Sequence, residues 1–247
     1  NSNVGTSAAF EIDTVVAATL TRGTTTRLID TSSLKSSFTS GSDGGSSVTP
    51  AAGSNRMLTF VTFWVHHGTP TATAPTLSFG GVSATEVDTY VSPSTFSPCY
   101  VIHRIAEASI PAGASATTIT ATESVFFVSS HLIEYSGVDQ TTPFGTAETF
   151  NTNATSISDT LNMTDTASLA LSGAFWRYGT GLTPIAPTTN SGGTITEIVE
   201  RSIAGSSSNG SCSIAEEQVG ATGNVTHTFT ASAAAPTVMF AIELFEA

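Results

Sequence analysis

Apolar and polar residues alternate in short runs along most of this chain, and glycine, proline and asparagine separate the runs. The clearest run is Met57–His66, in which Leu58, Phe60 and Trp64 fall on one face of an extended strand. The alternate positions, from Met57 to Val65, are mostly apolar too. Because both faces are apolar, the pattern predicts a central strand that is covered on each side.

The same reading predicts many other strands and no helix. No segment keeps the period of an amphipathic helix for more than a turn, and Pro111 ends the nearest candidate. We expect loops at residues 39–53 and 183–189. Strands are expected at residues 9–20, 25–30, 77–79, 85–91, 99–106, 117–122, 125–135, 149–163, 168–178, 194–201, 211–218, 224–231 and 236–245. Such a chain is typical of antiparallel β-sandwiches and jelly rolls.

Part of this pattern occurs twice, in the same order. Trp64 and Trp176 are 112 residues apart, and Gly80-Gly81 returns as Gly192-Gly193 at the same offset. Further pairs with nearly the same spacing are Thr85-Glu86-Val87 with Thr196-Glu197-Ile198, Cys99 with Cys212, and Ile133-Glu134-Tyr135 with Ile242-Glu243-Leu244. A period this long indicates a duplicated domain. We therefore expect two tandem sandwich units, residues 56–139 and 140–247, after an N-terminal arm with the first strands at residues 1–55.

Charge narrows the set of partners. Of 247 residues only 11% are charged, and the net charge is −12, with Lys35 as the only lysine. Such a surface repels nucleic acid and anionic membranes, and no apolar run is long enough to span a bilayer. The cysteines lack a Cys-x-x-Cys partner. Free, half-buried thiols are favoured for Cys99 and Cys212, and a bridge across a pseudo-twofold axis stays open.

Several stretches together resemble a known group of modules. They are Phe-Gly-Gly-Val-x-Ala-Thr from Phe79, Pro111-Ala-Gly, Thr-Ile-Thr-Ala-Thr from Thr118, and the run from Ile133 to Phe144 with its Tyr-Ser-Gly-Val-Asp segment. Over residues 56–247 the chain resembles the β-sandwich modules of bacterial secreted or cell-surface proteins and of tailed-phage structural proteins. The resemblance implies a non-catalytic role outside the cell or on a virion, and it transfers no catalytic residue.

Candidate chemistry is sparse. The repeated acids, Glu86 with Glu197 and Glu134 with Glu243, are better explained by structure than by a pair of catalytic carboxylates. Glu134 and Glu243 stand in the most apolar strands, so we expect hydrogen bonds or a pairing with an arginine such as Arg104 or Arg177. No Ser-His-Asp set has the character of a catalytic triad. The chain is therefore not expected to be an enzyme.

The remaining candidate ligands leave alternatives open. His103 and His131 could meet across neighbouring strands, although a polar spot within a sheet is the simpler interpretation. Asp43 and Asp139 lie in loops where sandwiches often bind calcium, yet no Asp-x-Asp cluster occurs. No other cofactor is indicated.

Aromatic residues could bind glycans if they were exposed. Trp64 and Trp176 are expected to be core anchors instead, and Tyr90, Phe96 and Tyr178 are the better candidates.

These observations favour a structural or assembly protein of a virion surface, such as a decoration or tail component, or of an extracellular filament. Its partners would be copies of itself or other virion or filament proteins. The alternative is a secreted carbohydrate-binding or adhesion module. One mechanistic hypothesis places an assembly strand at residues 9–20, which pairs with an open sheet edge of its own or a neighbouring molecule. Its apolar residues are Phe10, Ile12, Val15, Val16 and Leu20.

Overall fold

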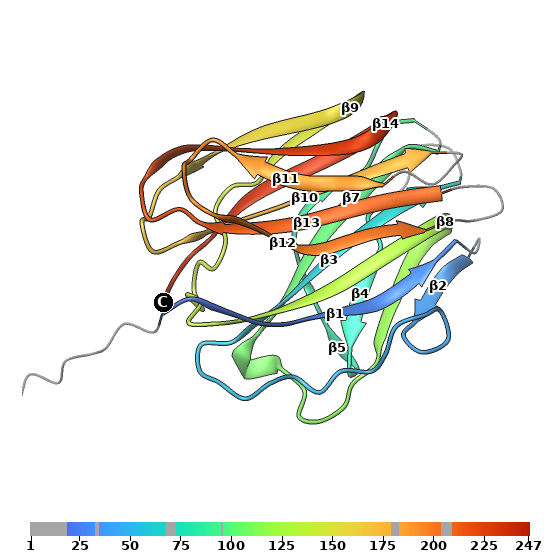
Figure 1. The fold of residues 1–247 in the computed structure, drawn as a ribbon. Coiled ribbons are helices and arrows are strands. Elements are labelled where there is room, and N and C mark those ends of the chain that lie inside the picture. Colours follow the sequence, from blue (N-terminus) through green and yellow to red (C-terminus); the bar gives the residue numbers. More distant parts are fainter. Residues whose placement is uncertain (1–18, 33–34, 68–72, 95, 179–182, 204–208) are drawn as a thin grey trace, which may run out of the picture.

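The computed structural model describes residues 19–32, 35–67, 73–94, 96–178, 183–203 and 209–247. They form an all-β protein of two antiparallel sheets (Figure 1), which confirms the predicted fold class. The described residues include no α-helix, only the 3₁₀ turn Glu107–Ser109. None of their helices is long and apolar enough to cross a membrane.

The first sheet holds the strands of the first half of the chain. Its central path is β5-β4-β8-β3-β7-β6, and β1 and β2 also pair with β8. The strands are β1 (Thr21–Thr31), β2 (Lys35–Thr39), β3 (Met57–His66), β4 (Thr76–Phe79), β5 (Val82–Ser83), β6 (Thr85–Tyr90), β7 (Pro98–Ala106) and β8 (Thr117–Ser136).

The second sheet holds the strands of the second half. Its path is β11-β14-β10-β13-β12, with β9 paired to the outer side of β14. The strands are β9 (Glu148–Met163), β10 (Leu169–Tyr178), β11 (Pro184–Thr189), β12 (Ile195–Ile203), β13 (Asn209–Gln218) and β14 (Gly223–Leu244). The order β4-β8-β3-β7-β6 matches β11-β14-β10-β13-β12 strand for strand. Descent of both sheets from one duplicated unit stays a prediction.

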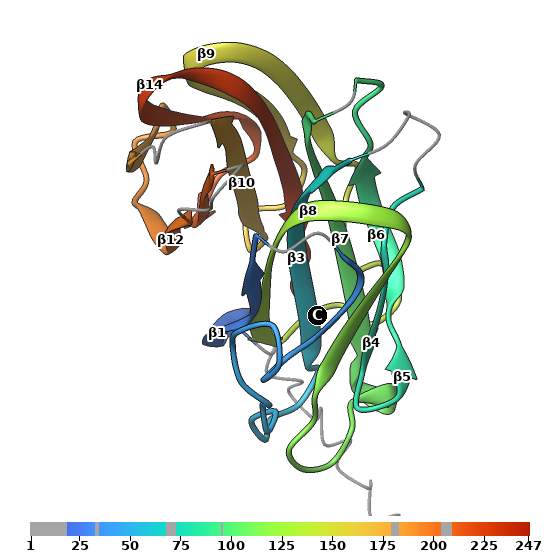
Figure 2. The same ribbon diagram turned by 90° about the vertical axis from the view of Figure 1, so that its right-hand side faces the viewer.

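Two expectations about the strands were wrong, and the first failed in both halves of the chain. Residues 117–122 and 125–135 form one continuous strand, β8, and residues 224–231 and 236–245 form most of β14. Each long strand bends, so that its first half curls away from the other sheet while its second half stays in the sandwich (Figure 2). Residues 183–189, expected as a loop, contain β11, whose prolines sit on an edge strand where a missing N–H is tolerated.

This bending gives the molecule three apolar regions instead of one. The shared core lies between the sheets and contains Phe63, Tyr100, Phe175 and Phe240. The interior of the first sheet is the opposite face of that sheet and contains Phe60, Trp64 and Phe79. The interior of the second sheet holds two smaller clusters, one around Trp176 and Phe229 and one around Leu161 and Val225. The central strand β3 thus contributes to two cores, as its two apolar faces predicted.

The shared core is closed by aromatic rings from both sheets. Phe63 of β3 lies with its ring centroid 5.5 Å from that of Phe175 and 6.2 Å from that of Phe240. Gly173 makes this close approach possible, because a Cβ there would stand 2.7 Å from the Phe240 ring and 3.1 Å from the Phe63 ring. A larger residue at this position would push the two sheets apart.

Candidate functional site

The repeated tryptophans and glutamates occupy matching places in the two sheets. Trp64 and Trp176 are both fully buried, each in the interior of its own sheet. Glu134 pairs with Leu58 on β3, and Glu243 pairs with Ala170 on β10, which is 112 residues further along. The side chains of both glutamates are buried.

Each glutamate fastens a loop and accepts no hydrogen bond from an arginine. Glu134 accepts hydrogen bonds from the Thr24 hydroxyl at 2.6 Å and the Ala51 backbone N–H at 2.8 Å. Glu243 accepts from the Thr164 N–H and hydroxyl, at 2.9 and 2.8 Å, and from the Asp165 N–H at 3.0 Å. Of the two expected alternatives, the described contacts therefore show hydrogen bonding and not pairing with an arginine. The Arg177 guanidinium lies instead over the Phe96 ring, 5.2 Å from its centroid.

The repeated cysteines are not equivalent, because their spacing differs by one residue from that of the tryptophans. Cys99 pairs with Trp64, whereas Cys212 pairs with Phe175, the neighbour of Trp176. A shift of one residue turns a side chain to the other face. Cys99 therefore lies in the first sheet's interior and Cys212 in the shared core, and both are free and buried. Burial raises the pKa of each thiol to about 12, so both are unreactive at neutral pH.

The two histidines that the sequence placed on neighbouring strands point to opposite faces of the first sheet. His103 pairs with Phe60 and lies in that sheet's interior, and His131 pairs with Val61 and faces the shared core. They cannot share a ligand. Burial lowers the pKa of His103 to about 4 and that of His131 to about 3, so both are neutral at physiological pH.

The two loop aspartates considered as calcium ligands are already engaged with protein donors. Asp43 accepts hydrogen bonds from the Lys35 ammonium group and from the Thr39 N–H. Asp139 accepts from the Thr141 N–H at 2.7 Å and from the Thr142 hydroxyl at 3.0 Å. Within the described part of the chain, no group of three His, Cys, Asp or Glu side chains could hold a metal ion.

A buried chain of polar groups in the second sheet's interior resembles a catalytic arrangement and was missed by sequence reasoning. The Ser172 hydroxyl lies 2.6 Å from Nδ1 of His227, and Nε2 of His227 lies 2.9 Å from the Glu217 carboxylate. Glu217 also accepts a hydrogen bond from the Ser191 hydroxyl. The sequence signal was a polar residue at each of three inward strand positions, beside Ala170, Ala215 and Val225.

Protonation and burial favour a structural role for this Ser-His-Glu chain. Burial raises the pKa of Glu217, but hydrogen bonds from Ser191, Thr189 and His227 outweigh burial and leave the pKa below its usual value. Burial lowers the pKa of His227, against the opposing effect of Glu217. The neutral imidazole thus donates from Nε2 to the carboxylate and accepts at Nδ1 from Ser172. Ser172, His227 and Glu217 are at most 2% exposed, so the hydroxyl has no open path to a substrate.

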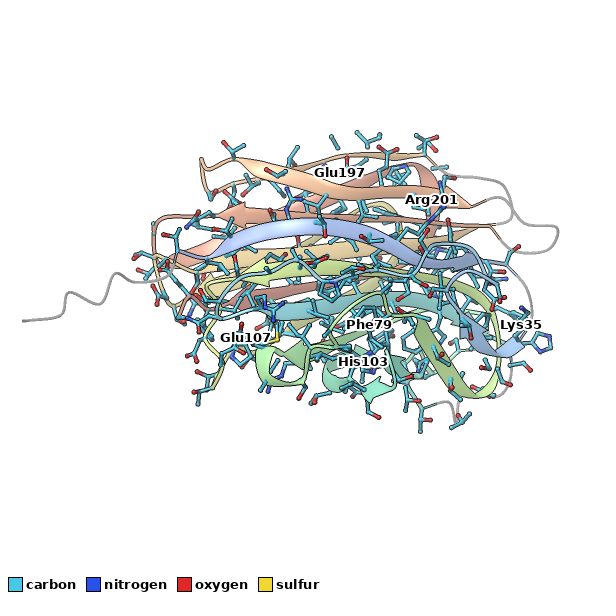
Figure 3. All side chains as sticks on the ribbon, turned by 90° about the horizontal axis from the view of Figure 1, so that it is seen from below. Lys35, Phe79, His103, Glu107, Glu197 and Arg201 are labelled. Atoms are coloured by element: carbon cyan, nitrogen blue, oxygen red, sulfur yellow. The ribbon has the colours of Figure 1, made fainter. Side chains whose placement is uncertain are left out.

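Ion pairs join β1 of the first sheet to β12 and β13 of the second. Arg22 of β1 pairs with Glu216 at 2.5 Å, and Arg201 of β12 pairs with Asp30 at 2.5 Å. Figure 3 looks onto this side of the molecule, with Arg201 and Glu197 on β12. Beside these pairs lies a cleft of about 260 Å³, between the Arg27 and His131 side of the first sheet and the Arg201 side of the second.

The longest sheet edge is β9, which forms the uppermost edge of the molecule in Figures 1 and 2. Its 16 residues pair only with β14 among the described strands. From Thr149 to Ser158 the strand has neither a charged residue nor a proline. On the exposed face of the sheet, pairs of hydroxyl groups link β9 to β14: Ser158 with Thr228 at 2.8 Å and Thr160 with Thr226 at 2.7 Å.

The other described edges carry the features that discourage strand addition. β5 has two residues, and β2 has five and begins with Lys35. β11 contains two prolines. β1, β6 and β12 each contain charged residues and at least one register shift. The β9 edge is therefore the surface of this molecule best suited to accept another strand.

The predicted assembly strand itself falls largely outside the described residues. Phe10, Ile12, Val15 and Val16 belong to that part of the chain. Leu20 is described: it is buried in the shared core, and its N–H donates to Glu246 at 3.2 Å. The strand that follows, β1, pairs with β8 of its own sheet.

Comparison with known proteins adds no identification. No family model matches the chain, and no curated protein or solved structure is significantly similar to it.

Proposed function

We propose that this protein is a non-catalytic structural protein that assembles through a sheet edge, on a virion surface or in an extracellular filament. The observation that carries the proposal is the β9 edge. It offers the unpaired N–H and C=O groups of a 16-residue strand, and the run from Thr149 to Ser158 carries no charge. Strand addition at such an edge supplies main-chain hydrogen bonds without a preformed pocket.

Sedimentation velocity over a hundredfold range of protein concentration tests this proposal, with negative-stain imaging of the same samples. We expect discrete oligomers or regular multimers whose fraction rises with concentration. A chain that stays monomeric at every concentration, with no ordered particle in the images, would overturn the proposal.

A second function is favoured by a neutral cleft of about 160 Å³ between the β6–β7 loop and the β9 side of the second sheet. Its lining includes Tyr90, Asn151 and Thr237 and no charged side chain. An aromatic ring beside amide and hydroxyl groups suits a glycan. Retention on polysaccharide gels that is lost in Tyr90→Ala would favour this second function. Equal migration of both proteins on every gel would count against it.

A further inference from the structure

Side chains along β9 point alternately into and away from the interior of the second sheet, and this alternation reverses between the two halves of the strand. In the first half, the even-numbered residues face the sheet's interior: Phe150 pairs with Met239 and Ala154 with Ala235. In the second half, the odd-numbered residues do so: Ile157 pairs with Phe229. The change occurs at residues 155 and 156, opposite the register shift between Thr230 and Ala235 of β14. The strand therefore has a defined midpoint.

This midpoint restricts how two copies of β9 could pair. Residues that are opposite each other in an antiparallel pair point to the same face of the sheet. A slip by one residue would put every pair on opposite faces, except the central residue that then lies opposite its own copy. A slip by two residues would oppose an inward residue to an outward one at the midpoint. Full-length pairing, with Thr155 opposite Ser156 of the second copy, keeps every pair on one face.

In this register, side chains that lack a packing or hydrogen-bond partner in a single copy would lie opposite one in the second copy. Phe150 is 48% exposed and would lie opposite Leu161 of the second copy. Thr152 would lie opposite Asp159 of the second copy, whose Oδ2 atom is buried without a hydrogen-bond partner. The two acids of β9 would face Thr152 and Met163, so no like charges oppose each other.

We propose that two copies of this chain pair antiparallel along β9, about a two-fold axis that passes between Thr155 and Ser156. The pair joins the second sheets of both copies into one continuous sheet. The inference rests on the proposed function and names its partner as a second copy of the chain.

Register-specific cross-linking tests the pairing. In this register Asn153 lies opposite Ser158 of the second copy, at the roughly 4.5–5.5 Å Cα separation of an antiparallel pair, which a disulfide can bridge. Asn153→Cys and Ser158→Cys proteins are purified separately, mixed and oxidised mildly. Cys99 and Cys212 are buried, so they do not compete.

We expect at least about tenfold more covalent dimer in the mixture than in either variant alone, because equal residues are five positions, roughly 17 Å, out of register. A mixture of Asn151→Cys with Ser158→Cys reports a slip by two and should stay uncoupled. Removal of residues 1–18 should leave the cross-link unchanged. Equal coupling in all samples, or loss of coupling on that removal, would overturn the pairing.

A second measurement does not depend on introduced cysteines. Phe150→Ser should weaken the dimer about tenfold in sedimentation, which corresponds to a partial loss of apolar burial at two aromatic side chains, one from each copy. Ile185→Ser is the matched control, since Ile185 is also a large apolar side chain with high exposure, at 51%, and lies on β11. Oligomers that form without the Asn153–Ser158 cross-link, or that Phe150→Ser leaves intact, would overturn the β9 pairing and leave the proposed function standing. A monomer throughout would overturn both.

Discussion

The interiors of the two sheets share one strand order and a buried tryptophan at matched positions, but three other matched positions carry opposite chemistry. In the first sheet, aromatic and aliphatic side chains fill the space, and the rings of Phe60 and Phe79 lie 5.7 Å apart. In the second sheet, the residues 112 positions further along are polar. Two of them, Ser172 and Glu217, bind the His227 imidazole between them. The matched positions are Phe60 with Ser172, Phe79 with Ser191, and Ile105 with Glu217.

The comparison shows that a curled sheet of this strand order can enclose either an apolar interior or a partly polar one. In the second sheet, where these aromatic rings are absent, the His227 imidazole fills part of the space and forms hydrogen bonds with Ser172 and Glu217. The polar version demands hydrogen-bond partners for these groups, because leaving one of them buried and unpaired costs roughly 1–3 kcal/mol. The same demand explains why the polar chain divides the second interior into two small apolar clusters.

The largest expected change in stability comes from removing an aromatic ring from the interior of the first sheet. Phe60→Ala should lower the free energy of unfolding by about 4 kcal/mol, because it removes a fully buried ring and leaves a cavity. Denaturant unfolding monitored by fluorescence measures the change. Ser172→Ala, at the matched position, should cost roughly 1–3 kcal/mol. A loss below that of Ser172→Ala would show that the first interior is not tightly packed.

A pH series separates the unpaired histidine of the first interior from the paired one of the second. Nδ1 of His103 is buried without a hydrogen-bond partner, and the pKa of His103 is about 4. The unfolded chain binds a proton at His103 below about pH 6.5, whereas the folded protein does so only near pH 4. Above pH 6.5 His103 is neutral in both states and does not change the free energy of unfolding. As pH falls from 6.5 to 4, the free energy of unfolding falls by about 3 kcal/mol.

The variant His103→Leu should therefore lose about 3 kcal/mol less than the parent protein between pH 7 and pH 4. Denaturant unfolding at each pH measures the difference. Parallel curves for His103→Leu and the parent would show that His103 does not contribute to acid sensitivity.

The fold was predictable from the sequence because strand alternation is local information. Met57–His66 showed its two buried faces directly, and its bounds agree with β3. The bends of β8 and β14 were not predictable in the same way. Residues 123–124 in β8 and residues 232–235 in β14 interrupt the alternation and resemble turns. Only the pairing with neighbouring strands shows that each strand continues past this point. Prolines hid β11 for a similar reason.

The polar chain and the β9 edge depend on pairing between distant residues. Ser172 and His227 are 55 residues apart, and nothing local brings them together. The cysteines show how sensitive such inference is, since a spacing difference of one residue placed Cys212 in the shared core instead of the second interior. Likewise, the sequence shows that residues 149–158 of β9 carry no charge, but which strands remain at an edge follows only from the order of the sheet.

The smallest effect would test whether the second interior acts as one connected unit. A double-mutant cycle of Glu217→Ala and His227→Ala should give a coupling energy of about 2 kcal/mol, because either change alone leaves the other group buried without its partner. Denaturant unfolding of the parent, both single variants and the double variant measures it. The same cycle on Phe60 and Phe79 should give a smaller coupling of about 1 kcal/mol, since an aromatic pair adds little beyond its buried area. Equal coupling in the two cycles would mean that hydrogen bonding does not distinguish the interiors, and the polar chain would then be only a filler of the same volume.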